Sequence, residues 1–541
     1  MHNNIAVSLV EAARLSPDEV ALIAKTKVGW RSWTFTEIHA NVACYADFLK
    51  GQGIGQGDRV MLMVRPSMEF ICLSFALFAI GAVVILIDPG MGYRNLLRCI
   101  GSVKPSVLVA IPKAQLFCRL FRHPFRTVRR HICVGNGFGL LGKKLPPPSP
   151  GRELSITPTR ADDLAAIIFT TGSTGPPKGV RYEHRIFKAQ LQQIRDYYRI
   201  GPGDVDQPAF PLFALFSIAL GASAVIPDMD PTRPAKVNPP RFIQSINAYQ
   251  VTYSFGSPAI WNVISRYCEA TGLQLMSLKK VLMAGAPVSG ALIERLQAIL
   301  PADAEIHIPY GATESLPIVS ITGREVLAET WALTRQGRGG CVGRPLPGIE
   351  VRVISISDEP IESLPAGFQG LPTYEVGEII VRGPVVTTAY DNNDSENRLA
   401  KIRDGKGFWH RVGDLGYLDD SGRLWFCGRK AHRVTTANGV LYTICCEAIF
   451  NNHSQVSRSA LVGVGEPGRM RSVLIIEPVS KVHDPRQFFG ELREMALRHE
   501  HTAGIKDFLI HEAFPVDIRH NAKIFREKLA VWAAKQLRQV K

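Results

Sequence analysis

Residues 170–179 read TTGSTGPPKG, and this stretch decides how the rest of the chain is interpreted. It follows an apolar run at 161–169 (ADDLAAIIF) and precedes an amphipathic run at 184–198, so the pattern predicts a strand, a glycine-rich loop and a helix. The glycines let the backbone turn its N–H groups inward, and the hydroxyls and Lys178 add donors. A flexible surface loop is the alternative, but the full ten-residue string favours a polyphosphate site, with a spacing unlike the Walker A loop.

Strand-like and helix-like patterns alternate on both sides of this loop. Apolar runs such as 251–256 and 279–286 are typical of buried parallel strands separated by helices. From 342 to 428 the pattern changes to short strands and turns, which predicts a small β-rich unit. We therefore expect an α/β fold with parallel-type sheets in a large domain at 1–428, followed by a small C-terminal α+β domain at 429–541.

One segment tests whether the chain crosses a membrane. Residues 70–87 carry no charge over 18 positions, which is the length at which a spanning helix becomes a candidate. Gly81 divides the segment into a helix-like half and a β-branched half, and a turn signal, Asp88-Pro-Gly, follows. The pattern favours a buried helix followed by a buried parallel strand over a transmembrane span.

The composition limits the classes of function. Charged residues make up 21% and hydrophobic residues 46% of the 541 residues, which excludes a disordered or fibrous chain. The net charge of +15 is partly local, because 119–144 holds seven Lys and Arg and no acid. That stretch is either a solvated face or a docking surface for a membrane or a partner. No recognised nucleic-acid module accompanies the charge, so nucleic acid is not an expected partner.

The cysteines and the N-terminus suggest the compartment. The ten cysteines show no spacing typical of a zinc site, and the N-terminal residues lack a basic stretch followed by an apolar one. We therefore expect free thiols and a cytoplasmic protein.

The loop at 170–179 resembles the phosphate loop of the adenylate-forming superfamily, which includes acyl-CoA synthetases, peptide-synthetase adenylation domains and firefly-type luciferases. Further motifs follow in the expected order along essentially the whole chain. The resemblance implies ATP and Mg²⁺ as cofactors and assigns nucleotide binding to Thr170, Thr171, Gly172, Ser173, Thr174, Gly175, Lys178, Gly285, Ala286, Pro287, Tyr310, Gly311, Ala312, Asp414 and Arg429. It implies catalytic roles for Thr313, Glu314 and Lys523, with Glu314 as the metal ligand.

The chemistry of these residue types agrees with the implied roles. Tyr310 offers a flat face to adenine, and Asp414 can accept hydrogen bonds from both ribose hydroxyls. Glu314 supplies a hard oxygen ligand suited to Mg²⁺ beside phosphates, and Arg429 can bridge a phosphate and a carboxylate. Lys523 would count as an ordinary surface lysine without the resemblance.

A closer resemblance concerns the β-lactone synthetase family of bacterial long-chain olefin biosynthesis. The stretches that carry it are 210–216 (FPLFALF), 226–235, 428–434 (GRKAHRV), 444–447 and 514–523. It implies that a long-chain 2-alkyl-3-hydroxy fatty acid is adenylated and that its own β-hydroxyl then expels AMP. It also implies partners, namely a β-lactone decarboxylase, a reductase and a thiolase-like condensing enzyme. The acyl pocket would include Phe213, Ala214 and Phe216.

Departures from acyl-CoA synthetases favour the same interpretation. Ala214 stands where many of those enzymes have His, Ala431 stands where their hinge carries Asp or Lys, and 439–447 lacks their Pro. An internal nucleophile needs no second substrate site, and ring closure is assisted by tethering. The alternatives are a long-chain fatty acyl-CoA or acyl-AMP ligase and a noncatalytic acyl- or nucleotide-binding scaffold. The intact motif residues disfavour the scaffold. No transmembrane span is expected, whereas peripheral membrane contact is compatible with the sequence.

Overall fold

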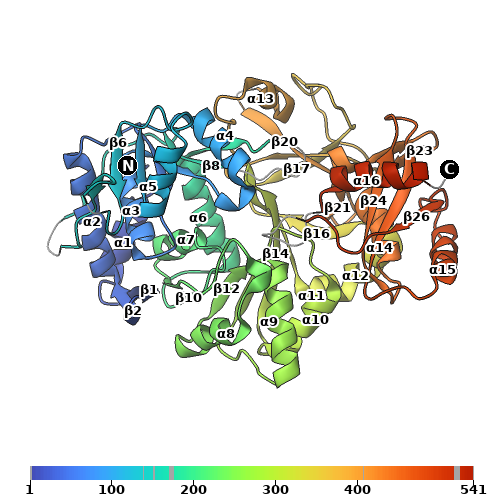
Figure 1. Cartoon of the computed structure of the whole chain (residues 1–541), viewed down its shortest axis with the longest axis horizontal. Coiled ribbons are helices and arrows are strands. Elements are labelled where there is room, and N and C mark those ends of the chain that lie inside the picture. The colour runs from blue at the N-terminus through green and yellow to red at the C-terminus, as the bar shows by residue number, and fades with distance from the viewer. Residues whose placement is uncertain are drawn as a thin grey trace.

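The N-terminal part of the computed structural model contains a seven-stranded sheet (Figure 1). The structure describes residues 3–137, 139–149, 153–169, 176–405, 407–516 and 524–539. Most neighbouring strands of this sheet run parallel, and only the last pair is antiparallel. Its order is β7 (Lys143–Lys144), β6 (Arg130–Cys133), β5 (Val107–Ala110), β3 (Arg59–Met63), β4 (Val83–Leu86), β8 (Leu164–Phe169) and β9 (Gly179–Glu183).

A second, 14-stranded sheet forms the middle of the molecule. Its parallel part consists of β1 (Val20–Thr26), β11 (Ser223–Val225), β10 (Val205–Asp206), β12 (Tyr253–Gly256), β13 (Lys280–Met283) and β14 (Glu305–Ala312), with β2 (Gly29–Thr34) antiparallel at its edge. The antiparallel part consists of β15 (Ser315–Thr322), β16 (Gly340–Pro345), β21 (Leu424–Arg429), β20 (Gly407–Leu418), β18 (Gly377–Arg382), β17 (Glu350–Ile354) and β19 (Lys401–Asp404). The predicted β-rich segment therefore forms and continues the large sheet through the β15–β16 pairing.

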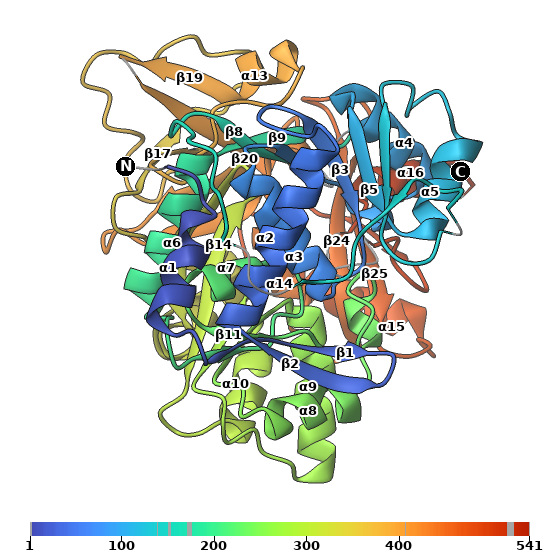
Figure 2. The ribbon, with the colours of Figure 1, turned by 90° about the vertical axis from the view of Figure 1, so that its left-hand side faces the viewer.

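Helices cover both sheets (Figure 2). Helix α6 (His184–Tyr198) has the bounds that the amphipathic pattern predicts. The other helices of this part include α2 (Phe35–Gly51), α4 (Tyr93–Val103), α5 (Pro112–Leu120), α7 (Phe213–Ala219), α8 (Pro239–Ala248), α9 (Pro258–Thr271) and α10 (Gly290–Ile299).

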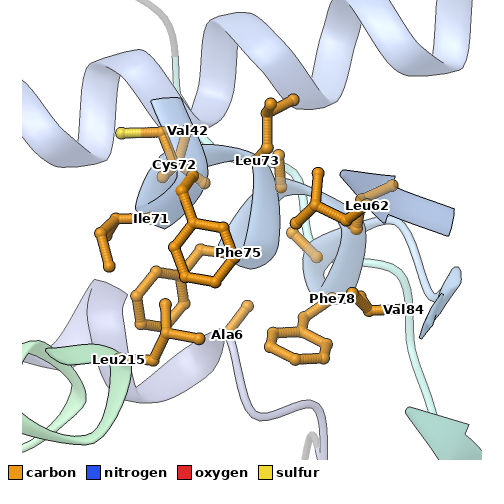
Figure 3. Close-up of a cluster of buried hydrophobic side chains, with 14 of the residues drawn as sticks. Ala6, Val42, Leu62, Ile71, Cys72, Leu73, Phe75, Phe78, Val84 and Leu215 are labelled. Carbon is orange, nitrogen blue, oxygen red and sulfur yellow. The ribbon is translucent and has the colours of Figure 1, made fainter. Parts of the chain in front are cut away.

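The uncharged segment at 70–87 lies in the protein core, as predicted. It forms most of helix α3 (Met68–Ala79), which is buried except at Glu69, and strand β4, which pairs in parallel with β3 and β8. Gly81 adopts φ +73° at the division between the two. Phe75 and Phe78 pack with Leu62, Val84 and other apolar side chains in the largest apolar cluster (Figure 3). Among the described helices, none is both long and apolar enough to cross a bilayer.

The C-terminal part is a compact α+β unit, as predicted. Strand β24 (Val456–Val464) pairs antiparallel with β25 (Arg471–Pro478), which pairs in parallel with β26 (Asp507–Ile510). Helices α14 (Thr443–Phe450), α15 (Pro485–Leu497) and α16 (Arg526–Gln539) and the hairpin β22 (Val434–Thr436) and β23 (Gly439–Leu441) complete it. Two apolar clusters belong to this part alone.

All ten cysteines are free thiols, and nine of them are buried. Burial raises the pKa of the Cys99 thiol to about 12 and holds the pKa of Cys72 well above its ordinary value. Because the thiolate is the reactive form, these side chains are inert in the folded protein.

Candidate active site

A cavity of about 1230 Å³ opens beyond the carboxyl ends of β12, β13 and β14. This is the edge at which ligands generally bind in open α/β sheets. Residues of α6, α7, β20 and β21 form further walls, and α14 and α16 contribute from the C-terminal part. The structure brings most of the described candidate residues to this one cavity, namely Lys178, Phe213, Phe216, Gly285, Ala286, Pro287, Tyr310, Gly311, Ala312, Thr313, Glu314, Asp414 and Arg429.

Three groups of candidate residues stand apart from that set. The loop residues 170–175 and Lys523 lie outside the described residues. Their described neighbours Pro176 and Ile524 both line the cavity. Ala214 is fully buried in the apolar core and does not line the cavity, so the structure does not bring it to the acyl wall.

Asp414 is held at the cavity wall by two partners. It pairs across the β20–β21 ladder with Arg429, whose Nη1 lies 3.0 Å from Oδ1. The Tyr310 hydroxyl donates to Oδ2 over 2.6 Å. Burial and the charge of Asp414 hold the pKa of Tyr310 well above its ordinary value, while the Asp414 carboxylate raises the pKa of Arg429. The result is a fixed, negatively charged acceptor facing the cavity.

Replacing Asp414 by Asn is expected to weaken ATP binding. Hydrogen bonds to a charged group contribute about 1.5–3 kcal/mol, so KM for ATP should rise roughly ten- to a hundredfold. Pyrophosphate release measured against ATP concentration tests this. Asp420→Asn is the matched control, because Asp420 is exposed and accepts from the Tyr374 hydroxyl over 2.8 Å. An unchanged KM in Asp414→Asn would contradict the predicted ribose contact.

Glu314 is positioned by its backbone and its side chain. Its carbonyl accepts from the backbone N–H and the hydroxyl of Thr387 over 2.9 and 3.0 Å. The Tyr390 hydroxyl donates to Oε1 over 2.8 Å, and the Tyr182 hydroxyl donates to the carbonyl of Thr313 over 2.5 Å. The glycine at 311 is required, because a Cβ there would lie 2.5 Å from the carbonyl oxygen of Ser315. These contacts fix the turn that presents Thr313 and Glu314.

Two lysines, Lys178 and Lys401, lie near the turn that presents Thr313 and Glu314. Lys178 forms an ion pair with Glu396, and its Nζ lies 5.1 Å from the centre of the Tyr390 ring. Lys401 donates to the carbonyl of Thr387, and burial lowers its pKa to about 7, although the charges of Glu314 and Glu183 oppose that shift. The described residues contain no cluster of three or more His, Cys, Asp or Glu side chains that could hold a metal ion. A magnesium ion bound through one carboxylate and the phosphates of a nucleotide fits this arrangement.

The cavity continues between the sheet and helices α6 and α7. Phe213 stacks on Phe255 with ring centres 3.8 Å apart, and Phe216 lies beside them. Asp206 also lines the cavity. Asp206 pairs with Tyr253 of β12, which pairs with Lys280 of β13, which in turn pairs with Glu305 of β14. Glu305 precedes Tyr310 by five residues, so at about 3.3 Å per residue the level of Asp206 along the strands is roughly 16 Å from that of Tyr310.

Asp206 is buried, and burial favours the protonated form of its carboxyl group by raising its pKa. The Ser217 hydroxyl donates to Oδ2 over 2.6 Å, whereas Oδ1 finds no hydrogen-bond partner among the residues that the structure describes. Burial raises the pKa of this carboxyl to about 8, despite the bond from Ser217. Asp206 thus adds a carboxyl group, whose protonated form is favoured by burial, to the wall of the cavity.

Replacing Asp206 by Asn is expected to remove a pH dependence of stability. Between the ordinary pKa of 3.8 and the folded value of about 8, the folded protein holds a proton that the unfolded chain has released. The wild type therefore loses stability relative to the variant as the pH rises through this window, by up to ~1.4 kcal/mol per pH unit. Urea unfolding at pH 5 and at pH 8 measures the difference, with the exposed Asp196→Asn as the control. If the difference in unfolding free energy between the wild type and Asp206→Asn were the same at pH 5 and at pH 8, a protonated Asp206 would be ruled out.

The C-terminal part closes the cavity with a buried ion pair. Arg526 Nη2 lies 2.6 Å from Glu447 Oε2, and Glu447 Oε1 accepts from the backbone N–H of Leu461 over 2.8 Å. Burial raises the pKa of Glu447 in spite of this pairing. His432 lines the same wall, and burial together with Arg526 and Arg429 lowers its pKa to about 3, so its imidazole is neutral.

The segment after β21 is bound to the large sheet. Lys430 Nζ lies 3.1 Å from Glu378 and 2.7 Å from the carbonyl oxygen of Ser357. Glu378 also forms a fully buried ion pair with Arg411, at 2.6 Å. Arg433 forms an ion pair with Asp358, the residue after Ser357. The connection between the two parts of the chain is therefore anchored through two cations.

Sequence reasoning missed several residues of this site. Tyr182, Tyr390 and Asp206 contact the candidate residues or line the cavity, but no motif marks them. Only the fold brings them to the cavity. Glu378 lies in β18, within the segment of short strands predicted at 342–428, yet its buried partner Arg411 is 33 positions away.

The chain is similar to proteins of known class along nearly all its length. The sequence profile of the AMP-binding enzyme family matches residues 9–391. The chain is 45% identical to the olefin beta-lactone synthetase of Xanthomonas campestris pv. campestris, over 98% of each chain. It is 43% identical to the olefin beta-lactone synthetase of Stenotrophomonas maltophilia, over 99% of this chain and 98% of that one.

A solved structure shares the fold. The amide bond synthetase McbA from Marinactinospora thermotolerans has a TM-score of 0.81, covers 98% of this chain and 99% of its own, and is 21% identical. The predicted fold class is confirmed by this likeness.

Proposed function

This chain belongs to the AMP-binding enzyme family, and from that membership we propose that it is an ATP-dependent β-lactone synthetase. Its substrate would be a long-chain 2-alkyl-3-hydroxy fatty acid, and its products a β-lactone, AMP and pyrophosphate. The observation that carries the proposal is the near-full-length identity of 45% and 43% to two olefin beta-lactone synthetases.

The first step would form an acyl-adenylate. The substrate carboxylate attacks the α-phosphorus of ATP, and pyrophosphate leaves. We assign the adenine and ribose to the wall formed by Tyr310 and Asp414, and the phosphates to the loop at 170–175 with Lys178. Lys523 and Arg429 would offset the negative charge on the phosphoryl oxygens. Magnesium, when bound through Glu314 and the phosphates, supplies further positive charge.

The second step would close the ring. The β-hydroxyl oxygen attacks the activated carbonyl carbon, the bond from that carbon to the phosphate oxygen breaks, and AMP leaves while the hydroxyl proton is released. The nucleophile and the electrophile belong to one molecule, so positioning replaces a second binding event. Phe213, Phe216 and Phe255 form an apolar wall suited to alkyl chains.

The anchored connection after β21 supports a cycle without an external acceptor. A thiol acceptor would need its own access to the adenylate, whereas Lys430 and Arg433 hold the C-terminal part against the large sheet. We propose that both steps occur in this one arrangement, with the division between the two domains near Arg429.

The test compares substrates and acceptors. The protein is incubated with ATP, Mg²⁺ and a 2-alkyl-3-hydroxy acid, with and without CoA, and the products are identified by mass spectrometry. We expect the acid to lose one water without CoA and one AMP to form per lactone. The matched 2-alkyl acid without the hydroxyl should give adenylate but no lactone.

Two other outcomes would replace the proposal. A CoA thioester as the only acyl product would identify an acyl-CoA ligase, and no nucleotide turnover with any acid would identify a noncatalytic scaffold. We further propose a cytoplasmic enzyme that hands its strained product to a β-lactone decarboxylase, in an assembly with a reductase and a thiolase-like enzyme.

A further inference from the structure

One stretch of the N-terminal part carries charge of one sign only. Asp88 and Glu153 flank a stretch of 64 residues that contains no acid. Helices α4 and α5 and strands β5, β6 and β7 belong to this stretch and lie together at one side of the molecule (Figure 2). Eleven cations of the stretch are exposed, namely Arg94, Arg98, Lys104, Lys113, Arg119, Arg122, Arg126, Arg129, Arg130, Lys143 and Lys144. We call this surface the basic edge.

Large apolar side chains stand among these cations. Leu116 and Leu120 are one helical turn apart on the outer side of α5 and are 54% and 76% exposed, whereas Gln115 and Cys118 of the same helix face inward. Tyr93 and Leu140 are both 72% exposed. A solvated charged face does not need protruding leucines, so solubility alone does not explain the composition of this surface.

Three aromatic side chains of this surface, Tyr93, Phe117 and Phe121, form one connected group. The ring of Phe117 lies 5.9 Å from that of Tyr93 in α4 and 4.7 Å from that of Phe121 at the end of α5. Arg119 donates to the carbonyl of Leu140, which brings the loop before β7 to the same helix. Cations and apolar groups are thus interleaved on one surface.

We propose that the basic edge binds the surface of an anionic lipid bilayer. Phospholipid headgroups supply a uniform negative field for the cations, and protruding leucine and aromatic side chains can enter the boundary below the headgroups. A protein partner would be expected to meet charges of both signs, which fix its register. Under the proposed function, the substrate and the product carry long alkyl chains, which gives such an enzyme a reason to work at a bilayer.

Edge protection explains only part of the basic edge. Lys143 and Lys144 form the outermost strand, β7, where lysines prevent pairing with another chain. The proposal therefore rests on α5 and the loop after it, where no strand edge needs protection.

The basic edge is linked to the candidate active site through Arg59. Its guanidinium donates to the carbonyl of Val103, at the end of α4, and forms a bidentate pair with Asp391 at 2.8 and 2.9 Å. Asp391 follows Tyr390, which contacts Glu314. This series of contacts joins the end of α4 to the wall of the cavity.

Vesicle sedimentation tests the proposal without turnover. The full-length protein is mixed with vesicles of phosphatidylcholine alone or with added phosphatidylglycerol, with no ATP or acid present. We expect binding to the anionic vesicles only, weakening as salt is added because exposed charges are screened. Equal binding to both vesicles, or no binding to the anionic ones, would overturn the proposal whether or not the enzyme makes a lactone.

Two double variants locate the surface. Arg122→Gln with Arg126→Gln should weaken binding about thirtyfold, and Leu116→Ser with Leu120→Ser about tenfold, because each removes one of the two contributions. The control for lost charge is Lys27→Gln with Lys481→Gln, and the control for lost apolar surface is Leu273→Ser with Met276→Ser. All four residues are exposed and lie outside the basic edge. Pyrophosphate release without vesicles should be unchanged in all four. If both basic-edge variants still bound anionic vesicles as the wild type does, the proposal would be overturned. If they bound vesicles normally but no longer bound an acidic protein partner, the surface would be assigned to that partner.

Discussion

The Lys523→Ala variant is expected to form acyl-adenylate about a hundred to a thousand times more slowly than the wild type. Removing one positioned donor to developing negative charge costs about 2.7–4 kcal/mol of barrier. The described residues that follow Lys523 support this assignment, because Ile524 and Arg526 line the cavity. Pyrophosphate release at saturating ATP and acid measures the rate directly.

The control for this prediction is a lysine of the next helix. Lys535→Ala removes an exposed cation from α16 and should leave the rate unchanged. Unfolding of both variants in urea should match the wild type, which separates lost chemistry from lost structure. Pyrophosphate release at the wild-type rate in Lys523→Ala would remove this residue from the proposed mechanism.

The Glu378→Gln variant is expected to lower the free energy of unfolding by about 3–5 kcal/mol. Glu378 and Arg411 are a fully buried ion pair, and removing one partner leaves the other charge uncompensated. Lys430 would lose the same partner, so the anchor of the connection after β21 should weaken as well. Urea unfolding followed by tryptophan fluorescence measures the change in midpoint.

An exposed pair provides the comparison. Glu350 lies 2.7 Å from Arg382 in strands β17 and β18 of the same sheet, but the Glu350 side chain is 50% exposed and that of Arg382 35% exposed. Glu350→Gln should therefore change the stability by less than about 1 kcal/mol. Equal midpoints for the two variants would show that burial of the Arg411 pair adds nothing to stability.

Local sequence patterns predicted much of the fold. The bounds of α6 and the division of 70–87 into α3 and β4 follow from periodicity and from one glycine, which act over a few residues. Strand β9 escaped prediction, because its five residues join the glycine-rich loop directly to α6 without an alternating pattern. The pairing that joins β15 to β16 is a tertiary contact and leaves no trace in either segment.

The candidate site was predictable where short motifs carry the chemistry. Tyr310 and Asp414 are 104 positions apart, yet each sits in a recognisable string, and the structure joins them through a hydrogen bond. Tyr390 and Asp206 were not predictable, because a lone tyrosine and a lone aspartate acquire their roles only through burial. Ala214 shows the reverse, since its string faces the cavity while its own methyl group packs in the core.

The buried thiols allow exposure of the protein interior to be followed by chemical labelling. Cys427 and Cys445 lie at the junction of the two parts, Cys446 lies in the core of the C-terminal part, and Cys72 and Cys99 lie in the N-terminal core. Apart from the half-buried Cys341, these thiols should react with a thiol-specific dye only when a region opens, and the order in which they are labelled would identify that region. The rate at which the dye labels the cysteines near Arg429 would then report how fast the two parts of the chain separate, and no cysteine would have to be introduced for the measurement.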